Sequence, residues 1–199
     1  MTSTNPRKAE YGVAPLFLDR WSPRAFTGEP IGKEQLLQIL EAAHWAPSAS
    51  NSQPWRFVIA HRDTPEFETL LSLLAEGNRI WAHRAAALIV LVSKKTFRPA
   101  GADEDVPARW HSFDAGAAWG YLALQASMLG WSAHGMAGFD AEAARRELNI
   151  PADHHPEIAI AIGKRGDKSV LAEGHQKIEQ PNGRAPLTAL VINGAFPKR

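Results

Sequence analysis

The spacing of apolar residues along the chain predicts one amphipathic helix and three strands. Within residues 33–46, apolar side chains recur at the three- and four-residue spacing that gives a helix one buried face. Residues 55–61 alternate between apolar and polar side chains, which is typical of a half-buried strand. Residues 86–93 (AALIVLVS) are apolar on both faces and predict a central strand, and residues 157–163 (EIAIAIG) predict another.

Three further helices are predicted from the residues that start and stop them. Residues 64–66 (TPE) form a strong helix start, because Thr can cap free N–H groups and Pro fits the first turn, and this helix should run over 64–77. A short helix is expected over 140–148, with an Asp cap. Residues 112–129 predict a long helix of small side chains, ended by Gly130. Such a helix should form the buried centre of the fold or of an interface.

The two ends of the chain and one internal segment lack this periodicity. A polar lead covers residues 1–15, and residues 94–110 are predicted to be a loop. Residues 164–199 form a long tail whose apolar patch is confined to 187–192. Such a tail cannot bury a core of its own, so it is either disordered or lies along another surface. The apolar patch favours the second alternative, with a partner subunit as the natural surface.

Composition narrows the class of protein. The 199 residues suit one domain, and 22 Lys plus Arg against 21 Asp plus Glu argue weakly against a dedicated nucleic-acid binder. The absence of Cys excludes disulfides, Cys-ligated metals and Cys nucleophiles. The start of the chain shows no secretory signal, and its most apolar run is too short to cross a membrane. We therefore expect a soluble, cytoplasmic protein.

The common catalytic motifs are missing. The sequence contains no G-x-G-x-x-G, no P-loop and no H-E-x-x-H. Asp153, His154 and His155 suggest a metal site, but adjacent His side chains on a Pro-bounded loop rarely converge on one ion, and we expect none. Residues 130–135 (GWSAHG) resemble a nucleophile elbow that is one residue too long.

The first unusual segment covers residues 20–26 (RWSPRAF). It places Arg20 and Arg24 around Ser22, ahead of Phe26. Two such arginines can converge on one anion, because a guanidinium binds phosphate through paired hydrogen bonds and a Ser hydroxyl can complete the site. A solvated surface pair, with Phe26 as a core anchor, explains the same residues equally well.

The second unusual segment is the loop at residues 46–55 (APSASNSQPW). Short donors and acceptors lie between two prolines, immediately before a predicted strand. Such a loop can direct several polar groups at the edge of a heterocycle. It can equally be an ordinary connection between a helix and a strand.

Together the two segments resemble the nitroreductase family of flavin-dependent oxidoreductases. The family has an Arg, Ser, Arg or Lys, Phe pattern near its N-terminus and an A-P-S-x-x-N-x-Q-P-W loop after it. The further matches, in the family's order, are Gly77-Asn78, the helix that ends at Gly130, Gly138-Phe139-Asp140, and Arg184 with Pro186-Leu187. The resemblance covers roughly residues 16–192. One departure is Trp81, because some members have Lys at that position.

The resemblance implies an α+β fold with a mixed, mostly antiparallel central sheet flanked by helices. The whole chain, 1–199, would then be one domain, with residues 164–199 wrapping a partner subunit. It also implies FMN bound at a homodimer interface. Arg20, Ser22 and Arg184 would hold the phosphate, and Arg24 and Asn78 the polar edge of the flavin. The full set of implied cofactor-binding residues is Arg20, Trp21, Ser22, Arg24, Pro47, Ser48, Ala49, Asn51, Gln53, Asn78, Met136, Ala137, Gly138 and Arg184.

The resemblance also implies a mechanism in which the flavin carries the chemistry and the protein supplies no catalytic residue. NADH or NADPH would reduce FMN, and a nitroaromatic, quinone or similar electrophile would then take the electrons in a ping-pong sequence. The aromatic residues expected around the substrate pocket are His44, Trp45, Trp81 and Trp110. A flavin-binding storage or sensing protein without turnover stays open as an alternative, as does dehalogenase or flavin-cleaving chemistry on the same fold.

Overall fold

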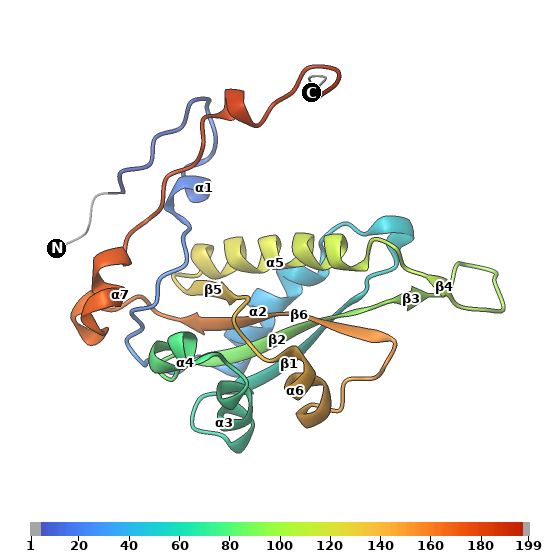
Figure 1. Ribbon diagram of the computed structural model, residues 1–199, viewed down its shortest axis with the longest axis horizontal. Coiled ribbons are helices and arrows are strands. Elements are labelled where there is room, and N and C mark those ends of the chain that lie inside the picture. The colour runs from blue at the N-terminus through green and yellow to red at the C-terminus, as the bar shows by residue number, and fades with distance from the viewer. Residues whose placement is uncertain (1–4, 197–199) are drawn as a thin grey trace.

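A four-stranded antiparallel sheet forms the centre of the protein (Figure 1). The computed structural model describes residues 5–196. The strands follow the order β1 (Trp55–His61), β2 (Ala87–Lys94), β6 (His154–Gly163) and β5 (Ser132–Met136). Each neighbouring pair is antiparallel. The predicted α+β fold with a mostly antiparallel sheet is therefore confirmed.

Strand β2 lies inside the sheet, as its two-sided apolar pattern predicts. Its first seven residues are all buried. Alternate side chains enter two separate cores: Leu88 and Val90 pack on one face, and Ile89 and Leu91 pack on the other. The period of two along a strand produces this division and requires helices on both faces.

Helices cover both faces of the sheet. One face carries α2 (Lys33–His44) and α5 (His111–Met128), and the other carries α3 (Pro65–Ser72), α4 (Glu76–Ala82) and α6 (Ala141–Glu147) (Figure 1). The small residues of α5 let this helix pack closely on α2 and on the sheet. The long small-residue helix is thus part of the core, and it also presents an exposed side.

The predicted helix over 64–77 is wrong in its second half. Thr64 caps the helix as expected, accepting a hydrogen bond from the backbone N–H of Phe67 at 3.3 Å. The helix ends at Ser72, however, because Leu74 forms an isolated β-bridge with Phe139. This contact spans 65 residues of sequence, so the local pattern gives no sign of it.

Strand β5 was not predicted at all. Its five residues include His134 and Gly135, which break the apolar pattern. Gly135 lies against helix α5, where an added Cβ would be 3.1 Å from the ring of Trp119. The glycine therefore permits a close approach of helix and strand that hydrophobic periodicity does not reveal.

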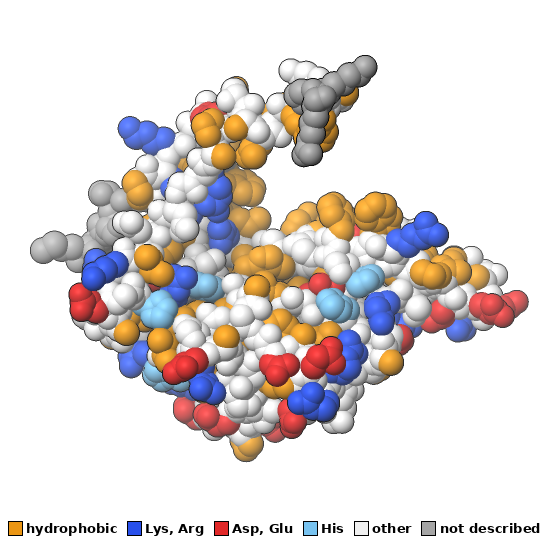
Figure 2. Space-filling view, viewed as in Figure 1, with side chains coloured by type: hydrophobic (Ala, Val, Ile, Leu, Met, Phe, Trp, Pro, Cys, Tyr) orange, Lys and Arg blue, Asp and Glu red, His pale blue; other side chains and the backbone are white. Residues whose placement is uncertain are grey.

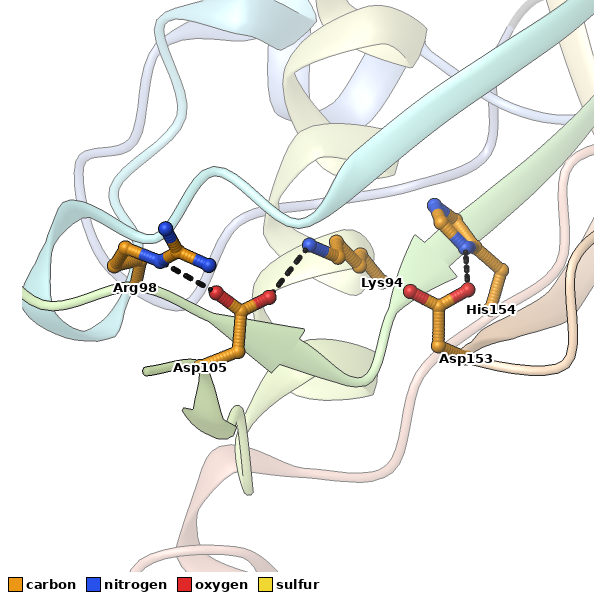
Figure 3. A network of polar contacts seen from close by, with 5 residues as sticks. All are labelled: Lys94, Arg98, Asp105, Asp153 and His154. Atoms are coloured by element: carbon orange, nitrogen blue, oxygen red, sulfur yellow. Dashed lines mark hydrogen bonds and ion pairs between the residues drawn. The ribbon is translucent and has the colours of Figure 1, made fainter. Parts of the chain in front are cut away.

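The predicted loop at 94–110 contains a small hairpin of β3 (Thr96–Phe97) and β4 (Val106–Pro107). Figure 3 shows Asp105 between Lys94 and Arg98, with N–O distances of 3.1 and 2.9 Å. The hydrogen bonds from these two cations lower the pKa of Asp105. Because these side chains are partly or largely exposed, the network stabilises the hairpin only modestly.

The two ends of the chain run side by side and project from the body (Figure 1). The N-terminal lead contains α1 (Pro15–Asp19), and the tail contains η2 (Lys168–Val170), α7 (Glu173–Ile178) and η3 (Leu187–Ala189). The backbone N–H of Leu187 donates to Glu10 at 3.2 Å. None of the helices in residues 5–196 has the length and apolar character needed to span a bilayer.

Candidate functional site

Three arginines converge where the two ends of the chain meet the body. Helix α1 ends at Asp19, and the half-buried Arg20 begins an extended segment. The pKa of Arg20 is lowered by desolvation first, and then by the positive charges of Arg7 and Arg184. Within residues 5–196, no carboxylate lies within ion-pair distance of Arg20. Such a cluster of uncompensated guanidiniums is suited to bind a phosphate-like anion.

Arg7 connects the three segments that build this cluster. Its Nη1 donates to the carbonyl oxygens of Leu18 at 3.0 Å and Arg20 at 2.8 Å, and its Nε donates to that of Asn182 at 2.7 Å. Sequence analysis missed Arg7, because a lone cation in a polar lead carries no periodic signal. A cavity of about 380 Å³ beside Arg20 is also lined by Lys164 and Arg165, so its lining holds three cations against the single carboxylate of Asp19.

The segment after Arg20 is fixed to strand β5. The buried His134 is hydrogen-bonded through Nδ1 to the carbonyl oxygen of Pro23 at 3.0 Å. Burial is the main cause that lowers the pKa of His134 to about 4, and the charge of Arg24 lowers it further. His134 is therefore neutral near pH 7, and its Nδ1–H can donate to Pro23. This bond holds Pro23 beside β5, which is an edge strand of the sheet.

Asn78 and Gly138, which are 60 residues apart, lie in contact. Asn78 Nδ2 donates to the carbonyl oxygen of Gly138 at 3.0 Å. An added Cβ on Gly138 would lie 2.8 Å from the same nitrogen, so a larger residue would displace Asn78. Ala137 and Gly138 are exposed, and their surface is open to a ligand. The structure thus brings these expected site residues together.

The loop at 47–53 is held in an unusual backbone conformation. Ser50, Asn51 and Gln53 all have positive φ angles, of 53°, 51° and 45°. The loop is fixed because the backbone N–H of Ala49 donates to the buried Asp114 at 3.1 Å. Strained, well-held loops of this kind are often functional. Sequence analysis did not assign Asp114, whose signal was an acidic residue in the first turn of an apolar helix.

The expected aromatic pocket is only partly present in one chain. Trp81 is 1% exposed and packs between Phe26 and His134 in the core, so its expected place in the pocket wall is wrong. Its indole Nε1 is buried without a hydrogen-bond partner among residues 5–196. The side chain of Met136 is also buried in this core, so the backbone is the part of this residue left for a cofactor contact.

The other three expected pocket residues occupy two separate places. Trp110 is 63% exposed and lines an apolar cavity of about 460 Å³ together with Phe113 and residues 47–49. His44 lines a different cavity with Gln53, and Trp45 is exposed beside His44.

Helix α5 separates the two groups of site residues. The cavity beside Arg20 is lined by Ala123 and Ser127 from the second half of α5. The loop at 47–53 lines another cavity together with Asp114 and Ala117, near the start of α5. Asp114 and Ser127 are 13 residues apart, which is about 20 Å at 1.5 Å per residue. One chain therefore holds two groups of candidate site residues at different places along one helix.

Comparisons with known proteins identify relatives of this chain. The sequence profile of the nitroreductase family matches residues 18–164. A Streptomyces coelicolor protein, provisionally named NADH dehydrogenase/NAD(P)H nitroreductase, is 34% identical over 170 residues, which cover 78% of this chain and 83% of that protein. The NADH dehydrogenase of Thermus thermophilus is 30% identical, with 88% and 92% covered.

A solved structure described as an oxidoreductase containing FMN is also similar to this chain. It is 48% identical, all of both chains is covered, and the TM-score is 0.93. The likeness thus extends beyond the profile match to the projecting ends. This chain belongs to the nitroreductase family.

Proposed function

We propose that this chain is an FMN-dependent oxidoreductase that uses NADH or NADPH. The observation that carries the proposal is the convergence of Arg7, Arg20 and Arg184, which have no carboxylate partner within residues 5–196, in a chain that also brings Asn78 and Gly138 together. A phosphate fits the first group, and a polar ring fits the second. FMN in the similar oxidoreductase, and the NADH dehydrogenase name of the relative from Thermus, support the choice of cofactor and donor.

The residues of this chain would bind and orient the cofactor. Arg20, Ser22 and Arg184 hold the phosphate, and Arg7 keeps the segments that carry them together. Arg24 and Asn78 would face the polar edge of the ring, where a cation favours the reduced form. Ala137 and Gly138 would lie against one face of the ring, because both are small and exposed.

When bound, FMN supplies the chemistry, since it accepts hydride from NAD(P)H and passes the electrons to a second substrate. We propose that this second substrate is a nitroaromatic, a quinone or a similar flat electrophile. Trp110 offers an exposed aromatic surface for such a molecule, beside the loop at 47–53. Because both substrates would use one pocket in turn, a ping-pong sequence follows.

We propose a homodimer, because the loop at 47–53 and Arg20 line different cavities of one chain, and a second copy could bring them to the same flavin. A second copy would place its loop over the ring, with residues 47, 48, 49, 51 and 53 contributing. The exposed side of α5 supports this interface, with Phe113, Tyr121 and Met128 at 75%, 44% and 67% exposure. An obligate dimer of this kind should bury more than about 1,600 Å².

The projecting arm supports the same assembly. Figure 2 shows apolar side chains on the arm and along the top of the body, with a hollow between them. Leu190, Val191 and Phe196 are among the exposed apolar residues of the tail. We propose that residues 164–199 wrap the partner, that 1–199 act as one unit, and that the enzyme works in the cytoplasm, where its hydride donors are available.

Steady-state kinetics and light scattering test this proposal together. The FMN-loaded protein should oxidise NADH or NADPH with a quinone or a nitroaromatic and give parallel double-reciprocal lines. Its mass should be that of two chains. A monomer that still holds FMN would contradict the dimer, and intersecting lines would contradict the ping-pong sequence. An FMN-binding protein without NAD(P)H oxidation would point to storage or sensing.

A further inference from the structure

Glu179 reaches from the tail into the segment that carries the proposed flavin contacts. Its Oε1 accepts hydrogen bonds from the backbone N–H groups of Arg24 at 2.7 Å and Ala25 at 2.8 Å. The side chain is only 4% exposed. These two hydrogen bonds to one charged acceptor fix the backbone of Arg24. The bond to Arg24 joins residues that are 155 positions apart in the sequence.

The other carboxylate oxygen of Glu179 is buried without a hydrogen-bond partner among residues 5–196. It lies 3.8 Å from Nη1 of Arg24, which is too long for a hydrogen bond and well within the range of charge attraction. A buried, undonated carboxylate oxygen destabilises a fold. An amide oxygen could accept the same two backbone bonds without burying a charge, so the charge itself calls for an explanation.

The charge of Glu179 acts on Arg24, which is the cation that the proposed function places at the flavin. An unpaired Arg24 would stabilise the negative charge that a flavin gains on reduction. A buried carboxylate at 3.8 Å opposes part of that effect, because the low dielectric of the interior strengthens the field of both groups. The two nearby groups therefore push the reduction potential in opposite directions.

We propose that Glu179 is a positioning residue for Arg24 and that its carboxylate lowers the reduction potential of bound FMN. This inference rests on the proposed function. Oε1 of Glu179 orients Arg24 by accepting hydrogen bonds from the backbone. Oε2 of Glu179, which has no hydrogen-bond partner among residues 5–196, moderates the charge of the Arg24 guanidinium. The tail then serves both ends of the cofactor, since Arg184 of the same tail belongs to the phosphate cluster.

The variant Glu179→Gln tests the proposal in the FMN-loaded protein. The amide oxygen can still accept the two backbone bonds, and only the charge is removed. An anaerobic titration against a reference dye should show a positive shift of the potential. The expected size is a tenfold change in the ratio of affinities for oxidised and reduced FMN, which is about 30 mV for a two-electron couple. The affinity for oxidised FMN should change less than threefold.

Two controls separate this effect from a general change in charge. Glu173→Gln removes a carboxylate from the same tail that is 84% exposed and pairs with Lys177, and it should leave the potential unchanged. Arg24→Gln alone should shift the potential in the negative direction, because it removes the cation and leaves the Glu179 carboxylate in place. A positive shift, or none, would overturn the role of Arg24.

The remaining outcomes also decide the proposal. If Glu179→Gln does not fold, Glu179→Met removes both the charge and the two backbone bonds to Arg24 and Ala25, and the loss of charge should still shift the potential in the same direction. An unchanged potential in either FMN-loaded variant overturns the inference and leaves the proposed function intact. Loss of FMN by both folded variants would assign Glu179 to cofactor binding and would also overturn the inference. A wild-type chain that binds no FMN would refute the proposed function itself.

Discussion

Replacing Arg20 with Ala should weaken FMN binding and leave the fold of the cofactor-free protein intact. A hydrogen bond to a charged group contributes about 1.5–3 kcal/mol. Arg20 is half-buried, so a loss of about 2 kcal/mol is expected, which is about 30-fold in Kd. Without FMN, the same substitution should leave the free energy of unfolding unchanged or raise it. The pKa of Arg20 is lowered by desolvation and by Arg7 and Arg184, so the folded state disfavours its charge.

Fluorescence titration with FMN and urea unfolding without FMN measure these two effects. Arg20→Ala should raise Kd about 30-fold, and the free energy of unfolding without FMN should stay the same or rise. Arg146→Ala, which removes an exposed guanidinium from α6, is the matched control and should change neither quantity. An unchanged Kd in Arg20→Ala would refute the phosphate assignment. A large loss of stability without FMN would show that Arg20 is a structural residue.

Three further predictions concern residues that hold the site in place. Asp114→Ala should lower the free energy of unfolding by about 1–3 kcal/mol, because the N–H of Ala49 loses its charged acceptor, and urea titration would show no change if that bond contributes nothing. Gly138→Ala should weaken FMN binding at least tenfold, because its Cβ would lie 2.8 Å from Asn78 Nδ2, whereas Gly174→Ala meets open space and should bind FMN normally. His134 has a folded pKa of about 4 against 6.5 in the unfolded chain, so the unfolded state takes up the proton first as the pH falls. Between pH 7 and 4, this residue should therefore remove about 3 kcal/mol of stability, and His134→Asn should show a correspondingly flatter dependence in urea unfolding.

The sequence predicted the parts of the fold that local patterns determine. Strand β1 has the predicted limits, and β2 begins and ends within one residue of its predicted ones. The Asp140 cap is confirmed, since its Oδ1 accepts from the N–H of Ala143 at 2.8 Å. Capping and two-sided burial are properties of a short window of sequence, which explains why they can be found without a structure.

The missed features all depend on contacts between distant segments. The break after α3 arises from the bridge between Leu74 and Phe139, and β5 depends on Gly135 fitting under Trp119. Trp81 is in the core because Phe26 and His134 surround it, and no residue near it in sequence indicates that. An aromatic residue in a motif position is therefore weak grounds for a pocket.

The site residues also divide into those that local motifs indicate and those that depend on contacts between distant segments. The motifs pointed to Arg20, Asn78, Gly138 and the loop at 47–53, whereas Arg7, Asp114 and Glu179 act through backbone groups of other segments. A residue that supports a motif from a distance leaves no spacing in the sequence.

Anaerobic mixing of the FMN-loaded protein with NADH, and separately with NADPH, tests the central claim most directly. The yellow flavin absorbance should bleach fully with one equivalent of at least one of the two donors, and it should return when a quinone is added. A protein that binds FMN and stays yellow with both donors would contradict the assignment as an NAD(P)H oxidoreductase.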